Sequence, residues 1–82
     1  MRYVYTGHIK TRMRLRKITK VEVEEALEHI VSRYSTPKDS TCIVGVTAAG
    51  RKLRVWIVGT DWPPKEPWIL KSTAGKDEED DF

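Results

Sequence analysis

The hydrophobic pattern of this chain changes its period near residue 38, and this change indicates a mixed α+β fold. Before residue 38, apolar residues recur every three or four positions, as on one face of a helix. After it, short runs rich in β-branched residues alternate apolar and polar side chains, as in half-buried strands. We therefore expect helices first and a sheet afterwards.

Two helices are predicted in the first half of the chain. The first covers residues 7–16, with Thr6 as its N-cap and a narrow apolar stripe at Ile9 and Met13. The second begins at a capping box, Thr19-Lys20-Val21-Glu22. Its apolar series extends to the stop at Ser35-Thr36-Pro37 and comprises Val23, Ala26, Leu27, Ile30, Val31 and Tyr34.

Three strands are predicted in the second half, at residues 40–47, 52–60 and 68–73. A glycine turn at 48–51 joins the first two as a hairpin, and a proline-rich loop at 61–67 precedes the third. The expected architecture is α-α-β-β-β, with both helices on one face of a three-stranded antiparallel sheet. The expected core is Leu27, Ile30, Val31, Val55 and Ile57, and Leu53 is expected to face the helices with the last two.

Charge is segregated along the chain. Residues 1–21 contain seven basic residues and no acid, whereas residues 77–81 are five acids in a row. The net charge is +3, and without those five acids it would be +8. We interpret residues 1–75 as one domain with a basic working surface, and residues 76–82 as an acidic, disordered tail.

Several classes of protein are disfavoured by what the sequence lacks. The single cysteine, Cys42, gives no disulfide framework, and the two histidines match no metal-ligand spacing. There is no glycine-rich phosphate or dinucleotide motif, so no cofactor or metal is expected. The longest apolar run, residues 55–58, is too short to span a membrane, and the N-terminus is unlike a signal peptide, so a cytoplasmic location is expected.

The predicted hairpin carries a feature typical of nucleic-acid binding. Arg54 and Trp56 should face away from the helices, on a side that nothing in the sequence covers. A cation beside an exposed aromatic ring suits a phosphate and a stacked base. Arg51 in the turn, and Arg12 and Arg16 on the first helix, are further candidate phosphate contacts.

The chain resembles the RelE/ParE/BrnT-like toxin superfamily in two motifs. "HIKTRMRLRKITKVEVEEAL", residues 8–27, is similar to a pattern of His, three residues, Arg-Met, then Arg-x-Ile-Thr and an acidic helix. "GVTAAGRKLRV", residues 45–55, is similar to the hairpin that follows it. The resemblance implies a RelE-like fold and, in several branches, sequence-tolerant ribonucleases of toxin–antitoxin systems.

From this resemblance we expect a small, metal-independent endoribonuclease that cleaves RNA through attack of the 2′-hydroxyl, together with a cognate antitoxin protein. His8 is the acid–base candidate and Arg12 the phosphate clamp, with Lys71 and Thr73 at the end of the last strand, where the family places active-site groups. The tyrosine typical of some RelE-like C-termini has no counterpart here. Two alternatives stay open: a non-catalytic nucleic-acid-binding or regulatory module, and a gyrase-directed inhibitor. The oligomeric state is not predicted.

Overall fold

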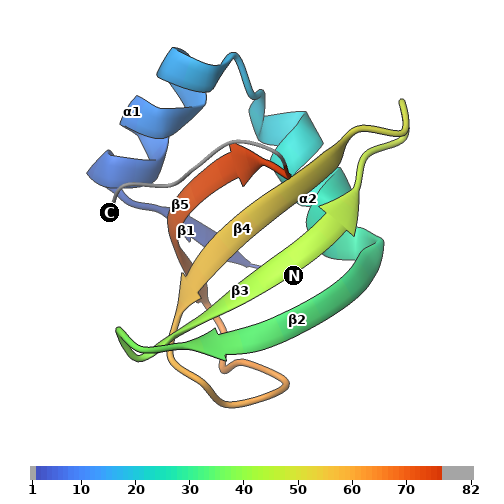
Figure 1. The fold of residues 1–82 in the computed structure, drawn as a ribbon. Helices are drawn as coiled ribbons and strands as arrows, with labels where there is room; N and C mark the ends of the chain where they lie inside the picture. Colours follow the sequence, from blue (N-terminus) through green and yellow to red (C-terminus); the bar gives the residue numbers. More distant parts are fainter. Residues whose placement is uncertain (1, 77–82) are drawn as a thin grey trace.

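The structure, a computed structural model, describes residues 2–76, so the acidic segment at 77–81 lies outside the described residues. Within these residues, two helices and five strands follow one another (Figure 1). Their bounds are β1 (Tyr3–Tyr5), α1 (Gly7–Arg16), α2 (Lys20–Glu28), β2 (Ile30–Thr36), β3 (Ser40–Val46), β4 (Lys52–Val58) and β5 (Trp68–Gly75).

The sheet is mixed and has five strands in the order β1-β5-β4-β3-β2. The β2–β3, β3–β4 and β4–β5 pairs are antiparallel, whereas β1 pairs in parallel with β5, with Tyr3 opposite Trp68 and Tyr5 opposite Leu70. The predicted three-stranded antiparallel sheet, and with it the α-α-β-β-β order, is therefore wrong. The three predicted strands are present, but β1 and β2 add one strand at each edge of the sheet.

The error at β2 comes from residues that fit both a helix and a strand. α2 ends at Glu28, and His29 closes it by donating its backbone N–H to the Ala26 carbonyl at 3.2 Å. The next seven residues pair with β3 as an antiparallel hairpin, which turns at Asp39 with φ of 53°. Ile30 and Val31 consequently lie on an edge strand with exposed fractions of 37% and 61%, and their predicted place in the core is wrong.

The helix starts, by contrast, are set by local hydrogen bonds and were predicted correctly. The Thr6 hydroxyl accepts the backbone N–H of Ile9 at 3.3 Å, so α1 begins at Gly7. At α2, the Thr19 hydroxyl accepts the Glu22 N–H at 3.1 Å, and the Glu22 carboxylate accepts the Thr19 N–H at 2.9 Å. This reciprocal pair satisfies backbone donors that would otherwise lack partners at the helix start.

The core lies between the helices and one face of the sheet (Figure 1). α1 packs on β5, and α2 packs on β3 and β4. Leu53, Val55 and Ile57 project from β4 into this core, as predicted. The remaining core residues are Ile9, Ile18, Val23, Ala26, Leu27, Ile43, Trp68 and Leu70.

Candidate RNA-binding surface and pockets

The first helix is fastened along β5 at both of its ends. The Thr6 hydroxyl donates to the Leu70 carbonyl at 2.9 Å and lies 3.4 Å from the Lys71 carbonyl. At the other end, Nη1 of Arg16 donates to the Thr73 carbonyl at 3.0 Å. The basic side of α1 therefore adjoins the strand that carries Lys71. We call His8, Arg12, Arg16 and Lys71 the α1–β5 basic surface.

His8 and Arg12 form a contact pair on this surface. Nε of Arg12 donates toward Nε2 of His8 at a distance of 3.4 Å, one helical turn apart. His8 is exposed and Arg12 is half-buried. The contact places the imidazole ring of His8 directly beside the guanidinium of Arg12. An acid–base group and a cation that can bind phosphate therefore lie together on one side of α1.

Thr73 does not reach this surface with its hydroxyl. Its side chain is fully buried, and its Oγ1 donates to the Arg54 carbonyl on the neighbouring strand at 2.8 Å. In the β4–β5 register Thr73 is paired with Val55, and the side chain of Val55 points into the core. Among the predicted catalytic residues, His8 and Arg12 lie together on α1, Lys71 lies on the strand against which α1 packs, and the Thr73 side chain is turned inward.

Arg51 holds the helical layer together. Its guanidinium donates to the Lys17 carbonyl at 3.2 Å and to the Arg16 carbonyl at 3.4 Å, both at the end of α1. It also pairs with the Glu22 carboxylate at 3.3 Å. Arg51 thus satisfies carbonyl groups at a helix C-terminus and ties them to the start of α2. These contacts assign Arg51 a structural role.

The Trp56 ring on β4, which was predicted to be exposed for stacking on a base, is buried. Trp56 is 6% exposed, and the Arg54 guanidinium lies over its ring at 5.1 Å. Trp56 belongs to a second buried cluster with Cys42 and Ala74, on the sheet face opposite the helices. The expectation that nothing covers this face fails at Trp56, so its ring is not presented to a base as an open surface.

Sequence reasoning missed two other members of that face. Tyr34 on β2 pairs with Cys42 in the sheet register, and Ser72 on β5 pairs with Trp56. A hydrogen bond with Cys42, together with burial, raises the pKa of Tyr34. Ser72 Oγ and Arg54 Nε are buried atoms without a hydrogen-bond partner in the described part of the chain. Only the strand register brings these residues together, and no local motif signals it.

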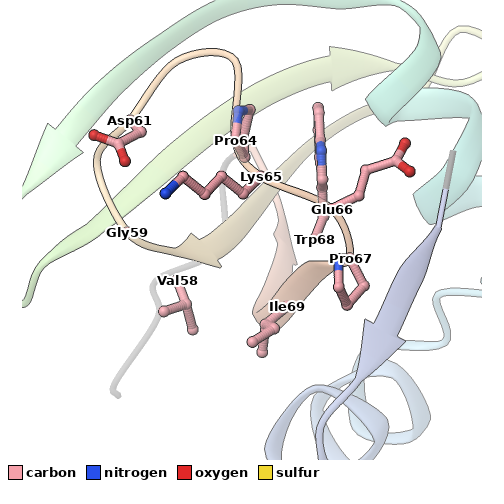
Figure 2. A pocket seen from close by; sticks show the side chains of 9 residues that line it. All are labelled: Val58, Gly59, Asp61, Pro64, Lys65, Glu66, Pro67, Trp68 and Ile69. Carbon is pink, nitrogen blue, oxygen red and sulfur yellow. The ribbon is translucent and has the colours of Figure 1, made fainter.

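The proline-rich loop encloses a pocket of about 320 Å³ at the ends of β4 and β5 (Figure 2). Val58, Trp68 and Ile69 supply apolar walls, and the Lys65 side chain extends toward the Asp61 side of the loop while the Glu66 carboxylate points away (Figure 2). Trp62 packs edge-on against Trp68 with a centroid distance of 5.7 Å. The pocket carries charges of both signs, so it does not select a ligand of one charge.

Within residues 2–76, no three His, Cys, Asp or Glu side chains are grouped so that they could hold a metal ion. None of the helices in that same stretch has the length and apolar character needed to cross a membrane.

These features define a small α+β protein whose first helix presents basic side chains beside the last strand. A family model described as "Domain of unknown function (DUF4258)" matches residues 5–62, which is more than half of the chain. The chain belongs to this family. The match includes α1, α2 and the β3–β4 hairpin and ends in the proline-rich loop before β5. No curated protein matches the chain, and no solved structure matches it either.

Proposed function

We propose that this protein binds RNA on the α1–β5 basic surface and cleaves it by attack of a 2′-hydroxyl on the adjacent phosphate. The observation that carries the proposal is the contact between Arg12 Nε and His8 Nε2 at 3.4 Å. It puts an imidazole, the usual acid–base group of proteins, beside a cation that can bind phosphate through two N–H groups. The order of the two sequence motifs, which resembles RelE/ParE/BrnT-like toxins, supports the same activity and a role as the toxin of a toxin–antitoxin pair.

Each residue of the surface has a role in the proposed reaction. His8 Nε2 removes the proton of the 2′-hydroxyl, and the 2′-oxygen forms a bond to phosphorus while the bond from phosphorus to the 5′-oxygen breaks. The Lys71 ammonium donates the proton that the leaving 5′-oxygen requires. Arg12 and Arg16 stabilise the negative charge that develops on the phosphoryl oxygens. The products are a 2′,3′-cyclic phosphate and a 5′-hydroxyl.

The test is cleavage of a labelled single-stranded RNA by the purified protein, with the product ends identified by mass spectrometry. The wild type should release cyclic phosphate ends, and an RNA with a single 2′-deoxynucleotide should be spared at that linkage. His8→Ala should lower the rate by about 10²–10⁴-fold because the general base is lost. Arg12→Ala should lower it by about 10²–10³-fold because transition-state charge is less stabilised.

Lys65→Ala is the charge-matched control because Lys65 is an exposed cation in the proline-rich loop, and its rate should equal that of the wild type. Full activity in His8→Ala, or cleavage at a 2′-deoxynucleotide, would overturn the proposed mechanism. Salt-dependent RNA binding without any cleavage by the wild type would instead favour a non-catalytic nucleic-acid-binding module on the same fold.

A further inference from the structure

A second basic region lies on the other side of α1, around a pocket with an apolar floor. The pocket has a volume of about 280 Å³ and lies between β1, α1 and the beginning of α2. Its lining residues are Tyr5, Lys10, Met13, Arg14, Ile18 and Lys20, which we call the helix-junction pocket. Lys10 and Arg14 project roughly 200° around the helix axis from His8 and Arg12, as helical geometry at 100° per residue requires. The helix-junction pocket is therefore distinct from the α1–β5 basic surface.

The floor of the pocket is held in place by the core. Ile18 is 4% exposed, and Met13 and Tyr5 pack against the same hydrophobic cluster. The Tyr5 hydroxyl donates to the Glu24 carboxylate at 2.7 Å, and the Lys20 ammonium lies over the Tyr5 ring at 4.9 Å. Burial and the hydrogen bond to Glu24 raise the pKa of Tyr5, so the donor persists near neutral pH. These contacts fix the ring that forms one wall before any ligand binds.

The rim of the pocket carries charge of one sign. Lys10 and Arg14 are exposed and lie four residues apart on α1, a spacing at which like charges repel and destabilise a helix. Within residues 2–76, neither side chain forms a hydrogen bond or an ion pair. Lys20 adds a third cation at the start of α2. Helix stability does not explain this arrangement, whereas attraction of a negatively charged partner does.

We propose that the helix-junction pocket binds an acidic peptide segment of a partner protein, with one apolar side chain of that segment inserted between Tyr5, Met13 and Ile18. The pocket of about 280 Å³ has room for one apolar side chain against the Tyr5, Met13 and Ile18 surface. Carboxylates on either side of the anchor pair with Lys10, Arg14 and Lys20. An apolar anchor surrounded by complementary charges is a common arrangement at protein interfaces.

The test measures peptide binding by fluorescence anisotropy with the full chain. The probe is a labelled peptide in which one leucine has three glutamates on each side, and the matched probe has serine in place of the leucine. The leucine peptide should bind at least about tenfold more tightly than the serine peptide, since tenfold corresponds to the transfer of one apolar side chain into a pocket. Equal affinities would overturn the proposal, because charge alone would then explain binding.

Two double variants locate the site. Lys10→Ala with Arg14→Ala should weaken binding of the leucine peptide by at least about tenfold, because two charge partners are lost. Lys52→Ala with Lys65→Ala removes the same charge from exposed positions on β4 and the proline-rich loop, and it should change affinity less than twofold. Equal losses in the two double variants would overturn the assignment to this pocket. Circular dichroism of both variants checks that they are folded.

This readout does not involve RNA, so the inference and the proposed function can fail separately. Peptide binding without RNA cleavage would leave the pocket assigned and remove only the ribonuclease proposal. Displacement of the leucine peptide by poly(U) as readily as by the unlabelled peptide would overturn the peptide site and assign the pocket to nucleic acid.

Discussion

Gly45 on β3 lies against the main chain of Ala26 on α2, so closely that no side chain fits between them. A Cβ atom added at Gly45 would be 1.9 Å from the Ala26 carbonyl oxygen and 2.5 Å from its carbonyl carbon. The obstacle is helix backbone, which cannot move aside as a flexible side chain can. Both residues are buried near the C-terminal ends of their elements, so this contact sets the distance between the end of α2 and the sheet.

Gly45→Ala is therefore expected to destabilise the fold strongly. Accommodating the methyl group requires α2 to move away from β3, which opens the packing around Leu27 and Val23. The expected loss of unfolding free energy is about 3 kcal/mol, at the upper end for overpacking of a core. Urea unfolding followed by tryptophan fluorescence measures it.

Gly7→Ala is the matched control for this substitution. Gly7 is the first residue of α1, and a Cβ added there meets nothing within 4 Å. Alanine favours helix over glycine by roughly 0.5–1 kcal/mol, so Gly7→Ala should leave stability unchanged or raise it slightly. Similar destabilisation by both substitutions would contradict the close approach of α2 to β3.

Substitutions at Leu27 and Val31 distinguish the predicted longer helix from the observed strand β2. A helix continuing to Tyr34 would bury both residues, whereas the structure buries Leu27 and leaves Val31 61% exposed on β2. Leu27→Ala should cost about 3 kcal/mol by loss of contacts and creation of a cavity. Val31→Thr keeps a β-branched side chain and should change stability by less than about 0.5 kcal/mol. A large loss of unfolding free energy in Val31→Thr would contradict β2 and support the longer helix.

The outcome at these residues shows which parts of the fold are encoded locally. The starts of α1 and α2 follow from Thr6 and from Thr19 with Glu22, because each cap is complete within four residues. The alternation on β4 likewise predicts the inward side correctly. The end of α2 depends on pairing between β2 and β3, which competes with helix formation in residues 30–36. The three residues of β1 pair with a strand more than sixty positions away, so no local pattern reveals them.

The candidate site divides in the same way. His8 and Arg12 are four residues apart on one helix, so their contact follows from the sequence once the helix is known. The roles of Arg51, Trp56 and Thr73 are set by neighbours distant in the sequence: carbonyl groups at the end of α1, the cluster with Cys42 and Ala74, and a hydrogen bond to Arg54. Composition marks such residues as cations, aromatics and hydroxyls, but only tertiary packing determines which of them reach the surface.

Glu22 should make stability depend on pH in the acid range. The hydrogen bond from the Thr19 N–H, followed by the one from Arg51, holds the pKa of Glu22 below its usual value of 4.5 in the folded state. Because the folded pKa is depressed, this contribution is present above the unfolded pKa and is lost as pH falls through the folded pKa. Glu22→Gln keeps a side-chain acceptor for the Thr19 N–H and should cost only about 0.5 kcal/mol at pH 6.

Urea unfolding of the wild type and of Glu22→Gln at pH 6 and at pH 3 measures this effect. The difference in stability between the two proteins should shrink at pH 3, since the wild-type carboxyl group is then increasingly protonated. Arg51→Ala should show a smaller fall in stability with pH than the wild type because one partner of the carboxylate is missing. A constant difference between wild type and Glu22→Gln across this range would show that the carboxylate does not contribute through its charge.

The five acids at residues 77–81 are expected to weaken RNA binding. Removing residues 77–82 raises the net charge from +3 to +8, and a run of carboxylates attached to a basic protein competes with phosphates at a high effective concentration. Deletion should tighten binding of single-stranded RNA by about tenfold at 50 mM salt, and the gain should disappear near 1 M salt, where the Debye length is about 3 Å. Binding is measured by anisotropy of a labelled RNA.

A variant that carries the same acids on a longer flexible linker separates local competition from the change in net charge. If that variant binds RNA as weakly as the wild type, local competition is excluded and net charge alone accounts for the effect; if it binds more tightly, the acids compete for the basic surface from their native position.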